Sequence, residues 1–158
     1  KNVPKPKKPA GADEKSLKGL HLSIAFAVAA TQYAYNTGDY SLLEQSSMSE
    51  PERNYFLREE KERLDKTREG TFWPDNITIE YTLTEESPRL EGDGEYIWDR
   101  EFIVEYGKFE VVDGKVEYPS DEDHDMIYRD KFIGNLTAQY INGAWITSAV
   151  ANQPKSKS

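Results

Sequence analysis

Two charged residues interrupt apolar faces of predicted strands, and they have the clearest capacity for chemistry. Arg100 falls between Trp98 and Phe102 on one alternating face, and Asp130 interrupts a second strand in the same way. A charge that faces a protein interior costs several kcal/mol unless it is paired. Three arrangements are open: a bulge or bend turns each side chain outward, the two side chains pair, or Arg100 binds an anionic ligand while Asp130 orients it.

The segment Asp121–Asp125 places four carboxylates and one imidazole within five residues. Carboxylate-rich loops can bind Ca²⁺. The glycine and terminal glutamate of the EF-hand spacing are absent from this segment. We therefore expect a solvated loop, and we predict neither a metal site nor a cofactor.

Composition and charge exclude several classes of function. The chain of 158 residues has no cysteine and two histidines, which excludes disulfides, a thiolate metal site, a cysteine nucleophile and a histidine-rich metal site. The net charge is −9, and residues 80–125 carry sixteen acidic against four basic side chains. A surface this acidic repels phosphates, so we predict that nucleic acid is not a partner.

The chain divides into one domain and two short ends. Residues 1–12 contain four lysines and three prolines and have little to bury, so we expect a disordered, extended tether. Residues 153–158 are expected to be a disordered tail. Residues 13–152 are long enough to form one domain with its own core.

Helical patterns fill the first half of this domain. Apolar residues recur at helical spacing from about Ser16 to Asn36, and Gly38 supplies the left-handed conformation that ends a helix. Capping-box patterns at residues 41–44 and 49–52 then predict a short second helix and a third that ends near Gly70.

From residue 76 the apolar period changes from helical to two, which is typical of strands. Asp113-Gly114 and Asn142-Gly143 are turn dipeptides that predict two hairpins. A two-residue turn at Asn142-Gly143 would place Tyr140 opposite Trp145 and Ala138 opposite Thr147. Helices followed by antiparallel strands predict an α+β fold with the helices on one face of a strongly curved sheet.

Long strands that curl around a buried helix make a cone, and such a cone commonly has a pocket at its open end. We expect the pocket to be lined by aromatic residues of the first helix and the strands, together with the two inward charges. The candidate ligand-pocket residues are Tyr33, Trp98, Arg100, Asp130, Tyr140 and Trp145.

The order helix, Gly-Asp, helix and curved sheet resembles the NTF2-like superfamily of cystatin-like α+β cones. Within it, YAYNTGDYSLLEQSS at residues 33–47 is similar to a signature of actinobacterial lipoproteins of unknown function. The resemblance implies a lipid anchor ahead of the tether and a domain on the outer face of the cytoplasmic membrane. Members often carry a cysteine pair after this signature, whereas residues 47–53 have none.

The superfamily also contains steroid isomerases, which need a tyrosine donor and an aspartate base. Aligned on Gly38-Asp39, the tyrosine position falls on Thr31, and a predicted helix, residues 44–48, replaces the segment of the base. Both catalytic positions are therefore vacant, and we predict no catalytic residues.

The sequence thus favours a non-catalytic, extracytoplasmic, membrane-tethered domain, monomeric or homodimeric. We expect it to bind a partner protein or a small molecule at the mouth of the cone. Two alternatives stay open, namely a small-molecule enzyme that uses the pocket and a structural accessory domain of the cell envelope.

Overall fold

A computed structural model describes residues 3–83, 89–91 and 95–154, without the side chains of residues 83, 89–91, 98 and 150–154. Helix α1 spans Leu17–Thr37, the 3₁₀-helix η1 spans Ser41–Gln45 and helix α2 spans Glu50–Glu69. The hydroxyl of Ser16 accepts from the backbone N–H of Gly19 at the start of α1, as expected of an N-cap. Among the described residues, no helix combines the length and the apolar content needed to cross a membrane.

The strands form two antiparallel sheets. The larger sheet has the order β2 (Thr78–Leu83), β4 (Glu95–Glu105), β7 (Arg129–Ile141) and β8 (Ala144–Pro154), with β3 (Arg89–Glu91) paired to β4. The smaller sheet has the order β1 (Phe72–Pro74), β5 (Glu110–Val112) and β6 (Lys115–Glu117). Its β5–β6 hairpin was predicted from the sequence, whereas β1 and the separation of this sheet from the larger one were not.

Both predicted hairpins are present. Asp113 and Asn142 adopt positive φ angles of 51° and 52°, and the glycine that follows each does the same. The last hairpin pairs Tyr140 with Trp145 and Ala138 with Thr147, which confirms the predicted register.

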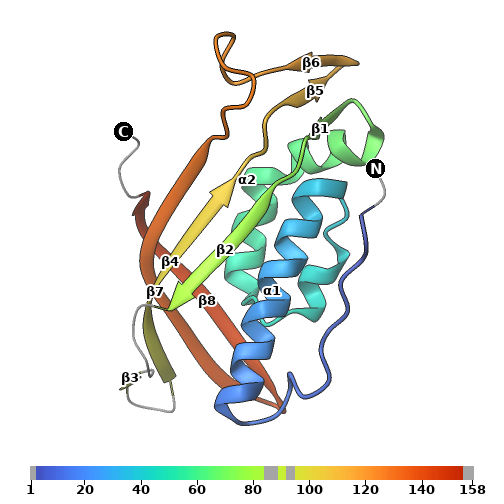
Figure 1. Ribbon diagram of the computed structural model, residues 1–158. Coiled ribbons are helices and arrows are strands. Elements are labelled where there is room, and N and C mark those ends of the chain that lie inside the picture. Colours follow the sequence, from blue (N-terminus) through green and yellow to red (C-terminus); the bar gives the residue numbers. More distant parts are fainter. Residues whose placement is uncertain (1–2, 84–88, 92–94, 155–158) are drawn as a thin grey trace.

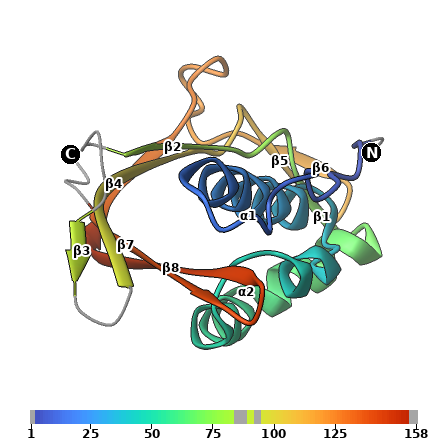
Figure 2. The ribbon, with the colours of Figure 1, turned by 90° about the horizontal axis from the view of Figure 1, so that it is seen from below.

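The larger sheet curls strongly around the two helices (Figure 1). Seen along the strands, α1 lies inside the curve near β2, and α2 lies on the side of β8 (Figure 2). The fold is therefore α+β, with N-terminal helices on the concave face of a half-barrel, as predicted.

Side chains of α1 bind the free edge of the sheet at β2. The carboxamide of Asn36 accepts from the backbone N–H of Ile77 and donates to its carbonyl, both at 2.8 Å. The carboxamide of Gln32 accepts from the N–H of Ile79 at 2.9 Å. Two side chains one helical turn apart thus serve the backbone groups that a further strand would otherwise pair.

The segment between the helices binds the opposite edge, at β8. The backbone of Thr147 exchanges hydrogen bonds with Ser47 (2.7 Å) and Ser49 (2.8 Å). The carboxyl of Glu52 then accepts from the N–H of Ala149 at 3.0 Å. This differs from the predicted capping box, in which Glu52 would bind the N–H of Ser49, because that N–H is already bound to β8.

Residues 3–9 run beside the helices without regular secondary structure, and residues 10–16 form turns that lead into α1 (Figure 1). Ala12 is buried, and its carbonyl accepts from the hydroxyl of Ser23 at 2.6 Å. Further along, Tyr140 and Trp145 donate to the carbonyls of Asp13 (2.6 Å) and Glu14 (2.8 Å). These bonds fasten the chain ahead of α1 to the last hairpin.

Gly38 and Gly70 end α1 and α2 in the same left-handed conformation, with φ of 80° and 86°, but their surroundings differ. A Cβ on Gly38 would lie 2.3 Å from the carbonyl oxygen of Leu64, whereas a Cβ on Gly70 would meet nothing within 4 Å.

We expect Gly70→Ala to lower the free energy of unfolding by about 1 kcal/mol, the cost of the backbone conformation. Gly38→Ala should lower it by at least about 3 kcal/mol, because α1 and α2 must also separate. Urea denaturation measures both, and equal losses would contradict a close contact between the helices at Gly38.

Candidate functional site

A cavity of about 330 Å³ lies between the two helices and the concave face of the larger sheet. Its walls are mainly apolar and come from α1, α2 and strands β2, β4, β7 and β8. They include Ile24 and Val28 of α1, Glu52 of α2, Arg100 and Phe102 of β4, and Phe132 of β7. Two partly exposed residues of α2, Tyr55 and Glu59, also line it, which places an opening on the side of α2.

Arg100 enters this cavity from β4, and its side chain is 2% exposed. It lies directly opposite Gly134 of β7 in the strand register, and a glycine inside a strand often marks a close approach of another group. Its Nη1 donates to the carbonyl of Phe132 at 3.3 Å, and the guanidinium lies 4.3 Å from the ring centroid of Phe102. Its Nε has no hydrogen-bond partner among the described residues.

Glu52 is the acidic group beside Arg100 in the cavity. Burial raises the pKa of its carboxyl to about 7, and the N–H of Ala149 and the positive charge of Arg100 both oppose that rise. Within the described part of the chain, Arg100 forms no direct ion pair with Glu52. The cavity therefore holds a guanidinium and a carboxyl that interact electrostatically but do not form a salt bridge.

A second pair of polar residues, Tyr35 of α1 and Glu60 of α2, also lines the cavity. Burial raises the pKa of Tyr35 above its ordinary range, and the neighbouring Glu60 adds to the rise. Burial also raises the pKa of Glu60, against the positive charge of Arg63. The guanidinium of Arg63 lies 5.9 Å from the ring centroid of Tyr35.

The structure brings only part of the predicted site together. Arg100 lines the cavity, whereas Tyr33 packs against the cluster of α1 and η1 that contains Phe26 and Leu43. Tyr140 and Trp145 lie at the last hairpin, where they bind the N-terminal segment. The side chain of Trp98 falls outside the described residues.

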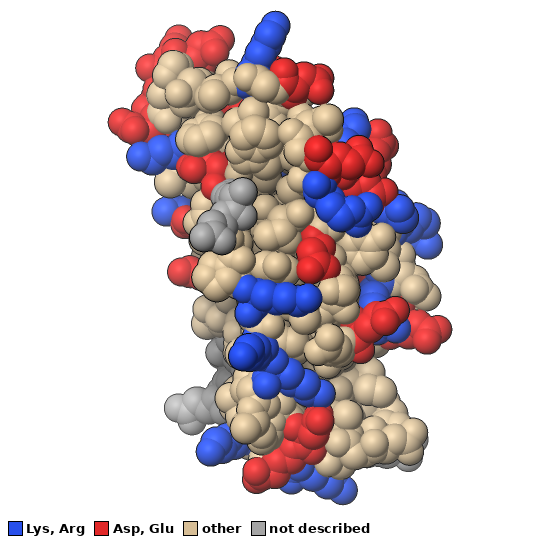
Figure 3. Space-filling view, turned by 90° about the vertical axis from the view of Figure 1, so that its right-hand side faces the viewer, with Lys and Arg blue, Asp and Glu red and all other residues tan. Residues whose placement is uncertain are grey.

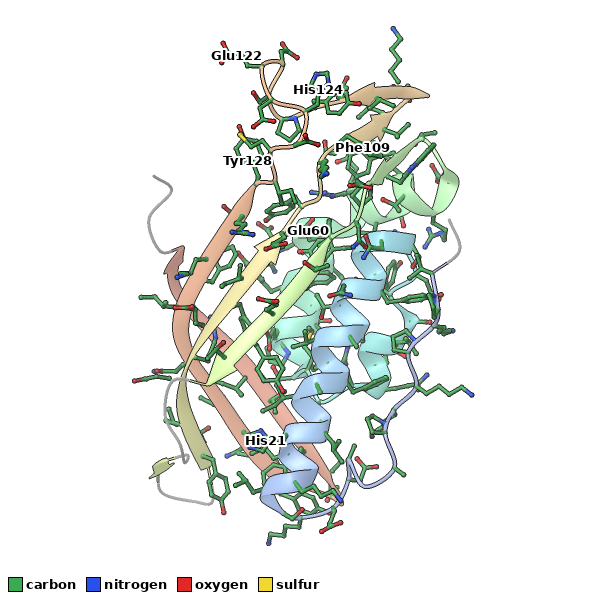
Figure 4. All side chains as sticks on the ribbon, viewed as in Figure 1. His21, Glu60, Phe109, Glu122, His124 and Tyr128 are labelled. Atoms are coloured by element: carbon green, nitrogen blue, oxygen red, sulfur yellow. The ribbon has the colours of Figure 1, made fainter. Side chains whose placement is uncertain are left out.

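Asp130 lies apart from Arg100, because it pairs with Val104 in the strand register, four residues further along β4. Its carboxylate accepts from the hydroxyl of Tyr106 at 2.9 Å, and both residues line a second cavity of about 350 Å³. Burial raises the pKa of Tyr106, and the bond to Asp130 adds to the rise. Figure 4 shows Phe109 and Tyr128, which also line this second cavity, at the end of the molecule opposite His21.

The acidic loop at residues 121–125 organises itself through its own side chains. The hydroxyl of Ser120 accepts from the N–H groups of Glu122 and Asp123, and Asp123 accepts from the N–H of Asp125. The ring of His124 stacks on Tyr118 at 3.6 Å between centroids. Within the described ranges, no three histidine or acidic side chains are grouped as a metal ion would require.

Glu52 was missed as a site residue because its sequence position fits a helix cap. Its burial depends on β8, which lies about 100 residues further along the chain. A glutamate close to a cap serine therefore gave no local signal of its position in the cavity. A glycine within a predicted strand, Gly134, was the one available sign of a close approach at Arg100.

The raised pKa of Glu52 predicts a pH-dependent stability. Its ordinary value is 4.5 and its folded value is about 7, so between these values the folded state binds a proton that the unfolded state has released. The free energy of unfolding should therefore fall as pH rises through this window, by on the order of 3 kcal/mol for this group. Glu52→Gln keeps an acceptor for Ala149 and should remove that part of the slope, measured by urea denaturation between pH 5 and pH 8.

The exposed Glu62 on the same helix supplies the control for this measurement. Glu62→Gln should leave the pH slope as it is in the unmodified protein. A slope that persists in Glu52→Gln would assign the effect to other groups.

Comparison with known proteins gives a family and no described function. A search of curated proteins finds no match to this chain. A family of unknown function, DUF6318, matches residues 1–151, which covers both helices, both sheets and the cavity between them. The chain therefore belongs to the DUF6318 family, whose function is unknown.

Proposed function

We propose that this domain binds a small, largely apolar molecule inside the half-barrel. The observation that carries the proposal is the cavity of about 330 Å³ between the helices and the sheet. This volume is at the lower end of the range of about 300–1,000 Å³ that is typical of small-molecule sites. Such sites combine apolar walls with a few polar groups, as here with Arg100 and Glu52.

An empty apolar cavity destabilises a protein in proportion to its volume, because the lining atoms lose contacts. Here the apolar lining includes Phe102 and Val104 on β4, Phe132 on β7, and Ile24 and Val28 on α1. An apolar occupant would restore the lost contacts. The opening beside Tyr55, which is 57% exposed, supplies a route of entry.

We also propose that the domain works on the outer face of the cytoplasmic membrane, held there by a lipid anchor ahead of residue 1. Two observations support this: the resemblance of residues 33–47 to lipoproteins of the NTF2-like superfamily, and six lysines within residues 1–18. Basic segments are attracted to anionic lipid surfaces. On the face that Figure 3 shows, Lys and Arg side chains are interspersed with Asp and Glu.

Filling the cavity tests the binding proposal. The neutral fluorescent probe N-phenyl-1-naphthylamine should bind the purified domain saturably, with a blue-shifted emission. Ala27 lines the cavity, whereas Ala25 on the same helix is exposed. We expect Ala27→Trp to reduce probe affinity at least tenfold by occupying the space, and Ala25→Trp to leave the affinity unchanged. The proposal fails if the probe does not bind the unmodified domain, or if it binds both variants equally well.

Protease treatment of intact bacterial cells that make the full-length protein tests the location. An extracytoplasmic domain should be digested without breaking the cells, while a cytoplasmic marker protein survives. A domain that resists digestion until the cells are lysed would contradict the proposal.

A further inference from the structure

The guanidinium of Arg100 is only partly satisfied by the protein. One donor group, Nη1, binds the carbonyl of Phe132 at 3.3 Å. The opposite edge of the guanidinium is formed by Nε and Nη2, and Nε has no acceptor among the described residues. This unpaired Nε belongs to a residue that is 2% exposed and lines the apolar cavity.

Leaving a buried donor without a partner destabilises the folded state, because the donor has lost its hydrogen bond to water. Stability alone does not explain the residue, because replacing a buried charge by an apolar side chain of similar size is often neutral or stabilising. Contact with Phe102 and the charge of Glu52 offset part of the burial cost, since both favour the charged guanidinium. Neither supplies an acceptor to Nε, so an acceptor from a ligand would complete the site.

The charges around the cavity limit what that acceptor can be. Among the described lining residues Arg100 is the only cation, and the carboxyls are Glu52 beside it and Glu59 and Glu60 further along α2. One guanidinium can neutralise one negative charge. A dianion such as a phosphate monoester would retain an uncompensated charge close to Glu52, which is costly in an apolar interior.

We propose that the ligand of the cavity is a monocarboxylate with an apolar body, whose two carboxylate oxygens accept from Nε and Nη2 of Arg100. The planar fork of a guanidinium matches the two oxygens of a carboxylate, and such paired bonds are stronger than bonds between neutral groups. The apolar body lies against Phe132, Val28 and their neighbours. This inference rests on the proposed function, because it names the class of molecule that the cavity binds.

A matched pair of ligands, decanoate and decanol, tests the assignment, since they share an apolar chain and differ in the head group. Affinities are measured by displacement of N-phenyl-1-naphthylamine at pH 6. At this pH decanoate is ionised, and the carboxyl of Glu52, whose pKa is about 7, is mostly protonated. The unmodified domain should bind decanoate at least tenfold more tightly than decanol. In Arg100→Met this preference should fall to about one, and Arg100→Lys, which keeps the charge and loses the fork, should give an intermediate value.

Arg129→Met is the matched control, because Arg129 is exposed on β7 and pairs with Glu105 at 2.6 Å. It should retain the full preference for decanoate. Melting temperatures of all three variants establish that they are folded, and the comparison of Lys with Met at position 100 keeps the test decisive if one of them is unstable.

Four results would overturn the assignment. Equal affinities for decanoate and decanol, or a preference for decanoate that survives in Arg100→Met, would exclude Arg100 as the carboxylate site and leave the binding proposal intact. Binding of N-phenyl-1-naphthylamine that neither decanoate nor decanol displaces would exclude this ligand class alone. Failure of the probe itself to bind the unmodified domain would remove the proposed function and this inference with it.

Discussion

The structure depends on closing the two open edges of a curled sheet. A strand at an edge presents backbone groups that would otherwise pair with another chain. Here Asn36 of α1 binds the backbone just before β2, and Gln32 binds it within β2. At the other edge, β8 is bound by Ser47, Ser49 and Glu52. The helices are therefore held by hydrogen bonds at the edges of the sheet as well as by apolar packing. These edge contacts fix where each helix lies on the sheet.

Holding the helices at the rims explains the space between them. Two clusters of buried apolar residues are packed. One lies around Leu20 near the start of α1 and Trp145 of the last hairpin, and the other lies between α1 and η1 around Phe26. In the middle of the sheet the side chains of β4 and β7 face a cavity instead of a helix packed against them. Glu52 links the two features, because one carboxyl both binds the edge of β8 and faces Arg100 across the cavity.

Local pattern predicted the elements well and the site in part. Gly38, the Asn142-Gly143 turn and the inward face of β4 each depend on near neighbours, so the sequence revealed them. Alternation along a strand predicts which face a residue takes, but not how far along the sheet it lies. Asp130 therefore shares an inward face with Arg100 and yet lies opposite Val104, four residues further along β4, where it binds Tyr106. Glu52 had a sufficient local explanation as a cap residue, and only contact with β8 places it in the cavity.

The same edge contacts have a consequence for synthesis of the chain. The bonds that fix the N-terminal part span 41 residues between Asn36 and Ile77, 100 between Ser47 and Thr147, and 131 between Glu14 and Trp145. Contacts this distant in sequence are slow to form, because a long loop must close before they are gained. A chain still on the ribosome can build α1 early, but it lacks the partners that hold α1 in place until the last hairpin has emerged. Folding of this domain is therefore completed only after nearly the whole of it has been released. Until then the apolar face of α1 is exposed, and such surfaces are prone to aggregation unless another molecule covers them.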